Sequence, residues 1–260
     1  MKSLLLMLFC ISFYLSAFAQ GSTLKVNWFY PKDAAKYEQL TDLDYNYGDS
    51  TYGKTTQIIH CESRQGHFEF VFTKKVRTLT RIIEYKEGGV GEVFNFSTNR
   101  WEHEAGTHAH KDMRSAPIDT IVYSEHNLYA FILLQDHGGV VEKARFQDFG
   151  NVVYWPSFEY PLCSVSDEDK DGMPEFYLTY YGASDGLDAK ELKQIVYTTP
   201  ATPTKGKSFI KSKATAYYAV DEEAAQSYRI EYDSNWKQLS PAIQQKSQAI
   251  LKKDKAKRVP

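Results

Sequence analysis

Residues 167–175, with the sequence DEDKDGMPE, hold the chain's clearest set of side chains able to do chemistry. Asp167, Asp169 and Asp171 alternate with other residues, so in a curled loop their carboxylates can converge on one centre. Carboxylates that close repel one another strongly unless a cation lies among them. Ca²⁺ in proteins takes about six to eight oxygen ligands, carboxylates above all. The spacing therefore predicts a calcium site.

The rest of this loop completes the ligand set. Glu175 offers a further carboxylate, directly or through water, and Met173 offers a backbone carbonyl. Gly172 can adopt the positive φ that lets a tight loop close, and Lys170 is expected to point outward. The predicted ligands are Asp167, Asp169, Asp171, Met173 and Glu175. A solvated acidic turn is the alternative, because Asp and Gly are ordinary turn residues.

The loop differs from an EF-hand. Its twelfth position is Leu178, where an EF-hand has a bidentate Glu. Residues 176–181, FYLTYY, are aromatic and β-prone, which predicts that the loop enters a strand. In this order it resembles the Asp-rich calcium loops of FG-GAP-type repeats, which read D-x-D-x-D-G-x-x-D and run into a strand. The resemblance implies a calcium ligand and places Glu175 where those repeats have Asp.

The likeness is local. The chain holds no second copy of the loop, so a multi-bladed propeller is not expected. With the segment DGLDAKELK at 185–193, the pattern also looks like one found in small exported bacterial proteins. That wider likeness covers the loop and the residues just after it, and it implies no catalytic residues.

Residues 1–19 have the composition of a secretory signal peptide. Lys2 gives a charged start, an apolar stretch runs from Leu4 to Leu15, and AFA at 17–19 is a small-x-small cleavage site. The apolar stretch is too short for a comfortable membrane span. We therefore expect an exported chain, periplasmic, surface-bound or extracellular, with no membrane span after cleavage. A short buried N-terminal helix is the alternative.

Charge and cysteine content narrow the range of partners. The chain has 31 Lys and Arg against 33 Asp and Glu, a net charge of −2. This argues against nucleic acid as a main partner, because phosphate binding needs a concentrated basic surface. The basic run at 252–258 is expected to be a solvated tail. Cys61 and Cys163 remain after cleavage, and either a disulfide or two buried thiols fits the sequence.

Most of the chain has the pattern of short strands. HFEFVFT at 67–73 alternates, with its phenylalanines on one face, as in a half-buried strand. The runs 118–123 and 128–135 flank Ser124–Asn127, which predicts a hairpin loop. Recurrent short strands with turn signals between them indicate a mainly β fold, an antiparallel sandwich or a barrel-like body.

The chain ends in a pattern typical of a helix, over about 240–254, followed by the basic tail. Ser240 is the expected N-cap, and Pro241 takes the first helical position. No linker long enough to force a boundary divides residues 20–260, so we expect a single domain after the signal peptide.

The segment HEAGTHAH, residues 103–110, is the best catalytic candidate. It is one residue too long for the H-E-x-x-H zinc motif, and the extra residue rotates the second histidine about 100° around a helix. His108 and His110 would share one face of a strand and could bind a metal, with His103, Glu104 or Asp112 as a third ligand. The segment is polar and flanked by Gly, Lys and Arg, so we expect a surface loop.

No other catalytic signature was recognised in the sequence. The four tryptophans and many tyrosines could form a surface on which sugars stack, although aromatic residues at strand spacing more often belong to a core. We expect a non-enzymatic, calcium-stabilised β-rich binding or structural module, with a glycan or protein of the cell envelope or extracellular space as its partner. The alternative is a secreted metal-dependent or acid–base hydrolase that uses His103, Glu104, His108 and His110.

Overall fold

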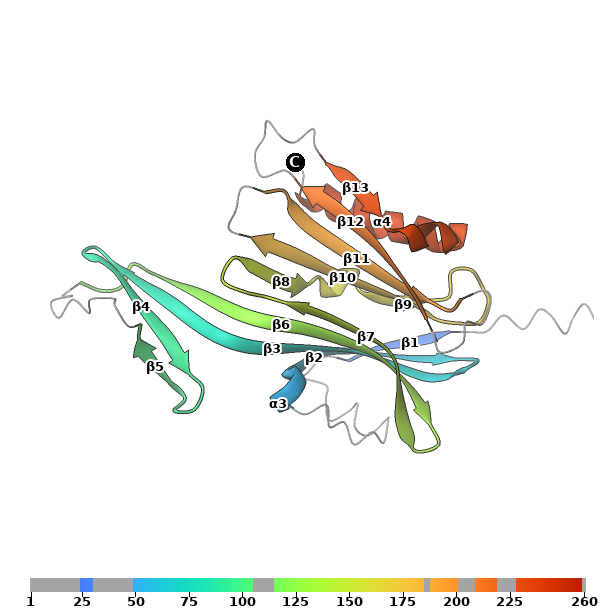
Figure 1. Cartoon of the computed structure of the whole chain (residues 1–260), viewed down its shortest axis with the longest axis horizontal. Helices are drawn as coiled ribbons and strands as arrows, with labels where there is room; N and C mark the ends of the chain where they lie inside the picture. The colour runs from blue at the N-terminus through green and yellow to red at the C-terminus, as the bar shows by residue number, and fades with distance from the viewer. Residues whose placement is uncertain are drawn as a thin grey trace, which may run out of the picture.

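A computed structural model describes residues 24–29, 49–104, 115–184, 188–200, 209–218 and 228–258. Over these residues the chain is mainly β, with two antiparallel sheets and one long C-terminal helix (Figure 1). The predicted fold class is confirmed as its sandwich form, since neither sheet closes into a barrel in the described part of the chain. That residues 20–260 form a single domain stays a prediction.

The first sheet is built around two long strands, β3 and β6, which pair antiparallel along nearly their whole length. On its other side β3 pairs first with β2 and then, further along, with β4. The seven strands are β1 (Lys25–Phe29), β2 (Lys54–Ser63), β3 (Gly66–Tyr85), β4 (Gly88–Asn95), β5 (Arg100–His103), β6 (Asp119–Asp136) and β7 (Gly139–Phe149).

This division of β3 gives the sheet two parts. Its first half lies with β1, β2 and β7 against the second sheet. Its second half, with β4, β5 and the first half of β6, continues away from the two-sheet body as an arm (Figure 1). We use the term arm for β4, β5, residues 78–85 of β3 and residues 119–125 of β6.

The second sheet has the strand order β13-β12-β11-β10-β8, with the short β9 beside the start of β10. Its strands are β8 (Tyr154–Phe158), β9 (Ser164–Ser166), β10 (Glu175–Ser184), β11 (Lys190–Thr198), β12 (Ile210–Tyr218) and β13 (Arg229–Tyr232). The helical elements are α3 (Asp49–Tyr52), η2 (Tyr160–Leu162), η4 (Ser234–Gln238) and α4 (Pro241–Arg258).

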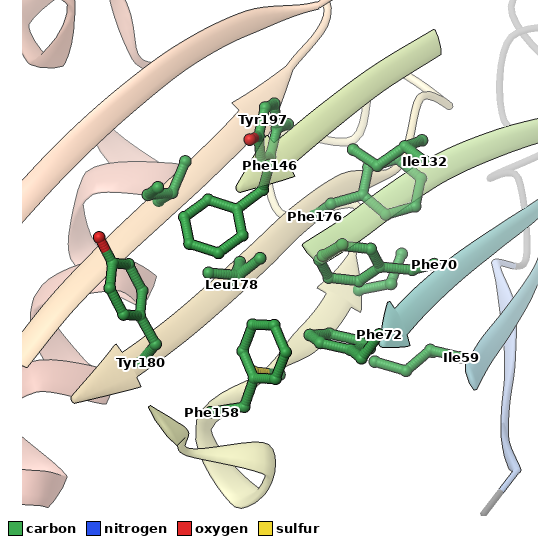
Figure 2. Packing of buried hydrophobic residues seen from close by; sticks show 14 of the residues in the cluster. Ile59, Phe70, Phe72, Ile132, Phe146, Phe158, Phe176, Leu178, Tyr180 and Tyr197 are labelled. Carbon is green, nitrogen blue, oxygen red and sulfur yellow. The ribbon is translucent and has the colours of Figure 1, made fainter. Parts of the chain in front are cut away.

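The main core lies between the two sheets. Phe70 and Phe72 of β3 pack toward Phe176 and Leu178 of β10 (Figure 2), and the rings of Phe70 and Phe176 are 5.5 Å apart. This confirms the phenylalanine face predicted from alternation in β3. The strand is not half-buried there, however, because Glu69, Val71 and Thr73 on its other face are buried as well. Truncation of one such buried ring to alanine costs about 3–5 kcal/mol, so these positions hold the sheets together.

Cys61 and Cys163 both lie in this core as free, buried thiols. The second of the two alternatives left by the sequence therefore describes the structure. Burial raises the pKa of each thiol to about 12. A thiol kept protonated in this way is a poor nucleophile and a poor metal ligand.

The helix α4 covers the outer face of the second sheet. Ile243 and Leu251 of α4 are buried with Tyr177 of β10 and Leu192 of β11. The predicted cap is present, because the Ser240 hydroxyl accepts a hydrogen bond from the Ile243 N–H at 3.4 Å. The predicted helix is thus confirmed, but the solvated tail predicted at 252–258 is wrong. The helix extends through this basic run to Arg258, and Asp254 within it is buried and accepts a hydrogen bond from the Tyr218 hydroxyl.

The hairpin predicted at Ser124–Asn127 is wrong. These residues lie inside β6, which continues without a turn where the arm joins the body, opposite a β-bulge in β3. His126 is buried there and its ring contacts the backbone carbonyl of Pro156 on β8. Polar residues in mid-strand mimic a turn signal, because only tertiary contacts of this kind show that they are partly buried.

Candidate metal centre

The acidic loop connects β9 to β10, and strand pairing fixes both of its ends. Ser166, the last residue of β9, lies opposite Glu175, the first residue of β10. Phe176 and Tyr177 follow, and they are fully buried in the cores on the two faces of the sheet. The loop therefore enters a strand, as predicted, and stands on a rigid part of the fold.

The structure brings the four predicted carboxylates together. One oxygen from each of Asp167, Asp169, Asp171 and Glu175 lies within 4.8 Å of those of the other three. Asp167 and Glu175 are buried, whereas Asp171 is exposed, so the cluster opens to solvent on one side. An acidic cluster with this geometry could hold a metal ion.

Backbone conformation closes the loop around the cluster. Gly172 has a φ of +84°, as predicted, and the exposed Lys170 has a φ of +63°. The Asp171 carboxylate accepts a hydrogen bond from the Met173 N–H at 2.7 Å, which fixes its direction. This contact involves the Met173 N–H and not its carbonyl. The predicted role of that carbonyl as a metal ligand therefore stays a prediction.

The electrostatics of the cluster favour a bound cation or a bound proton. Burial, and then the negative charges of Asp169 and Asp167, raise the pKa of Glu175 to about 8. This happens although its carboxylate accepts a hydrogen bond from the Glu168 N–H at 2.9 Å. Desolvation and the same two aspartates raise the pKa of Asp171. A cation at the centre would reverse both effects, since it stabilises the ionised forms.

An ion pair connects the loop to the C-terminal helix. The Lys246 ammonium of α4 lies 3.2 Å from the Glu168 carboxylate. Both side chains are partly exposed, so the pair stabilises the fold by no more than about 1 kcal/mol. The ion pair shows that the loop, the start of β10 and α4 lie together at one end of the second sheet.

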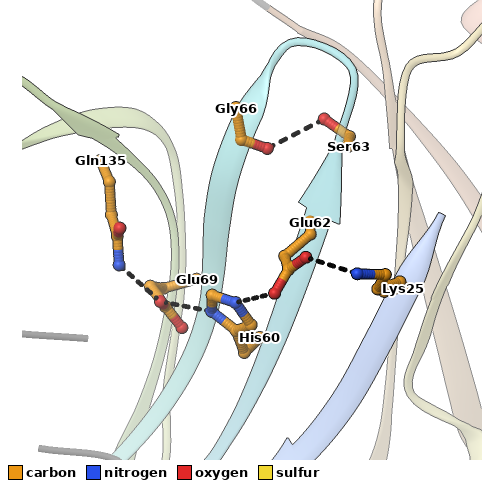
Figure 3. A network of polar contacts seen from close by, with 7 residues as sticks. All are labelled: Lys25, His60, Glu62, Ser63, Gly66, Glu69 and Gln135. Atoms are coloured by element: carbon orange, nitrogen blue, oxygen red, sulfur yellow. Dashed lines mark hydrogen bonds and ion pairs between the residues drawn. The ribbon is translucent and has the colours of Figure 1, made fainter. Parts of the chain in front are cut away.

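Sequence reasoning missed a second cluster of ionisable groups, on the outer face of the first sheet (Figure 3). The His60 ring lies between two carboxylates, with Nδ1 2.7 Å from Glu69 Oε1 and Nε2 3.8 Å from Glu62 Oε1. The Gln135 side chain donates a further hydrogen bond to Glu69 Oε1 at 3.1 Å. The pairs His60/Glu62 and His67/Glu69, each spaced i, i+2 on consecutive strands, were the signal that could have found it.

The imidazole position decides what this second cluster can do. Because the His60 ring separates Glu69 from Glu62, the arrangement suits proton sharing rather than a common metal ion. The Glu69 carboxylate, as a hydrogen-bond acceptor for the His60 ring, raises the pKa of His60, and burial raises the pKa of Glu69. The group therefore holds protons in the folded state.

The histidine segment considered for catalysis is only partly described. His103 ends the edge strand β5 and is exposed, with Nδ1 3.9 Å from Glu92 Oε1. Glu104 is exposed as well. His108, His110 and Asp112 lie outside the described residues, so a metal site there stays a prediction.

We compared the chain with protein-family models, with curated proteins and with solved structures. None of the three comparisons gave a match. The resemblance to FG-GAP-type loops therefore rests on the residues of the acidic loop.

Two of the four tryptophans lie in different surroundings in the structure. Trp236 is buried beneath α4, as expected for a core aromatic, whereas Trp101 is partly exposed on the arm and stacks with the Arg81 guanidinium at 4.2 Å.

The predicted signal peptide, residues 1–19, lies outside the described residues. No helix among the described residues has both the length and the apolar character needed to cross a membrane.

Proposed function

We propose that the chain is an exported, non-enzymatic β-rich module for binding or structural support, stabilised by Ca²⁺ in the acidic loop. The observation that supports this proposal is the convergence of Asp167, Asp169, Asp171 and Glu175 within 4.8 Å of one another. A cluster of this kind leaves several like charges in a small volume, and an oxygen-seeking divalent cation is the simplest group to neutralise them.

The donor chemistry favours calcium over its competitors. The cluster offers carboxylate oxygens without histidine or thiolate, whereas zinc sites in proteins are built mainly on nitrogen and sulfur. Mg²⁺ demands a near-ideal octahedron and retains several waters, while Ca²⁺ accepts a more irregular arrangement of oxygen ligands. Calcium sites of extracellular modules need dissociation constants of only about 10⁻⁴–10⁻³ M, which this small ligand set can supply.

The exported location and the partner are inferred from the sequence. The pattern of residues 1–19 supports export, and an oxidising, calcium-rich compartment suits a weak structural ion site. The slightly negative net charge argues against nucleic acid as a partner. We propose a cell-envelope or extracellular glycan or protein as the ligand of the module.

Calorimetric titration of the purified protein with Ca²⁺, Mg²⁺ and Zn²⁺ tests the proposal. We expect one Ca²⁺ per chain, weaker Mg²⁺ binding, and loss of the Ca²⁺ signal in the double variant Asp169→Asn/Asp171→Asn. The matched control, Asp119→Asn/Asp188→Asn, removes two exposed aspartates elsewhere and should bind as the wild type does. Stoichiometric Zn²⁺ binding that survives the first double variant would support the hydrolase alternative instead.

A further inference from the structure

Along one edge of the arm, β6 has no neighbouring strand among the described residues. β7 pairs with β6 as far as the Phe149–Asn127 pair and then turns away at Gly150. A side chain at Gly150 would place its Cβ 2.5 Å from the His126 carbonyl oxygen, so the turn is built for glycine. Residues Asp119–Glu125 of β6 therefore pair with β3 on one side and with no described strand on the other. We call these residues the free edge.

Apolar side chains are exposed along this row. Val122 on the free edge is 56 % exposed, and Val152, just beyond the end of β7, is 69 % exposed. The exposed large hydrophobics of this region are Ile118, Val122, Tyr123, Phe149, Val152 and Val153. An open strand edge with apolar side chains beside it can accept an added strand through N–H and C=O groups that have no strand partner. On this edge the Thr120 N–H already donates to the Asp119 carboxylate at 2.7 Å, and an added strand would compete with that local contact.

The negative charges at the two ends of the free edge determine which kind of segment can pair with it. Asp119 and Glu125 bracket the apolar centre of the free edge, and the exposed Glu84 lies opposite Asp119 on β3. A second copy of the chain, paired antiparallel about Val122, would set Asp119 against Glu125 at both ends. Like charges directly opposite each other destabilise a strand pair. A segment with Lys or Arg at both ends would convert each repulsion into an attraction.

We propose that the free edge binds an extended segment of a partner protein whose apolar centre is flanked by basic residues. The segment would lie antiparallel to β6, in the row that β7 leaves at Gly150, and would end beside Phe149. This inference is independent of any ion in the acidic loop, so the two can fail separately.

Side chains along β6 alternate between the two faces of the sheet, so each face of an added strand would contact a different set of them. Thr120, Val122 and Ser124 project to one face, and Ile121 and Tyr123 to the other. An added strand therefore meets hydroxyl groups and a valine on one face and two larger apolar side chains on the other. Branched or aromatic side chains opposite Ile121 and Tyr123 give the most favourable cross-strand pairs.

Two fluorescently labelled synthetic peptides test the proposal by anisotropy: Lys-Thr-Ile-Val-Tyr-Thr-Lys and its acidic counterpart, Glu-Thr-Ile-Val-Tyr-Thr-Glu. We expect the purified protein to bind the basic peptide at least tenfold more tightly. The double variant Asp119→Lys/Glu125→Lys should reverse this preference. A matched variant on the opposite edge of the arm, Glu102→Lys/Glu104→Lys, should keep it.

Further measurements test whether the basic peptide pairs with the free edge as a strand. A basic peptide with Pro in place of its Val should bind at least tenfold more weakly, because proline cannot donate to a strand ladder. Bound basic peptide should slow amide exchange at Asp119–Glu125, and circular dichroism checks that each variant is folded. Equal binding of the acidic and basic peptides, or a preference reversed by the opposite-edge variant, would overturn the proposal. So would a concentration-dependent dimer that Val122→Lys dissociates, since it would assign the edge to a second copy.

Discussion

Glu175 lies directly opposite Ser166 in the antiparallel pair of β9 and β10, so the two ends of the acidic loop are paired with each other in the sheet. Because both ends are fixed side by side, the short loop between them keeps its carboxylates close together. Their repulsion is relieved by protonation or by a cation, and this relationship underlies the first three predictions.

Glu175→Gln should stabilise the ion-free protein and weaken calcium binding. The pKa of about 8 in the folded state, against 4.5 as the ordinary value, means that folding near pH 7 requires Glu175 to take up a proton. The amide avoids this penalty, so we expect a gain of about 1–3 kcal/mol in chelator at pH 7. Denaturant unfolding in chelator and calcium titration measure the two effects. Loss of stability in chelator together with unchanged calcium affinity would contradict the account.

Calcium binding should release close to one proton per ion at pH 7. Glu175, with its pKa of about 8, is mostly protonated in the ion-free protein, and a bound cation lowers that pKa. Calorimetry in two buffers with different ionisation enthalpies counts the released protons. The number should fall toward zero above pH 9, where the carboxyl group is already ionised. Proton release that stays the same between pH 7 and pH 9 would exclude Glu175 as its source.

Gly172→Ala should lower calcium affinity, because Gly172 has a φ of +84° that alanine adopts only at a cost of about 1–2 kcal/mol. Gly138→Ala is a matched control, since Gly138 has a φ of +82° and lies in the β6–β7 turn, where an added Cβ meets nothing within 4 Å. Both variants should lose similar stability in chelator, and only Gly172→Ala should also bind calcium at least several-fold more weakly. Equal calcium affinities would show that the loop conformation does not matter for the ion.

The cluster of His60 and Glu69 should make the fold less stable as the pH rises. Both groups have a raised pKa in the folded state, so the folded protein holds more protons than the unfolded one. The contribution of Glu69 is fully present below its ordinary pKa of 4.5 and is lost as the pH rises through its raised pKa. That of His60 is fully present below 6.5 and is lost as the pH rises through its own raised pKa. Glu69→Gln should therefore flatten the fall in Tm between pH 5 and pH 8.

A histidine on the surface is the control for this pH effect. His137→Gln, on the β6–β7 turn, changes an almost fully exposed side chain and should leave the wild-type pH profile unchanged. If Glu69→Gln and the wild type lose stability in parallel over this pH range, other groups control the pH dependence.

Local patterns predicted what local interactions determine. The alternation of phenylalanines in β3 placed its core face, and Ser240 with Pro241 placed the start of α4. The acidic cluster was predictable for the same reason, since Asp167, Asp169 and Asp171 are close in sequence and a single loop brings them together.

Long-range pairing was beyond the sequence patterns. Ser124–Asn127 have turn-forming character, yet they lie inside β6 because β3 continues beside them from the body into the arm. The contacts of Glu69 with His60 and Gln135 connect three strands, and the Gln135 partner depends on a register that alternation alone does not set.

Thermal unfolding in chelator and in calcium tests the central claim most directly. Ca²⁺ at about ten times its dissociation constant should stabilise the fold by about 1.4 kcal/mol, which raises the Tm of a chain of this size by about 3–5 °C. The rise should vanish in Asp169→Asn/Asp171→Asn and persist in Asp119→Asn/Asp188→Asn. A wild-type Tm that is the same in chelator and in calcium would contradict the claim that the acidic loop holds this ion.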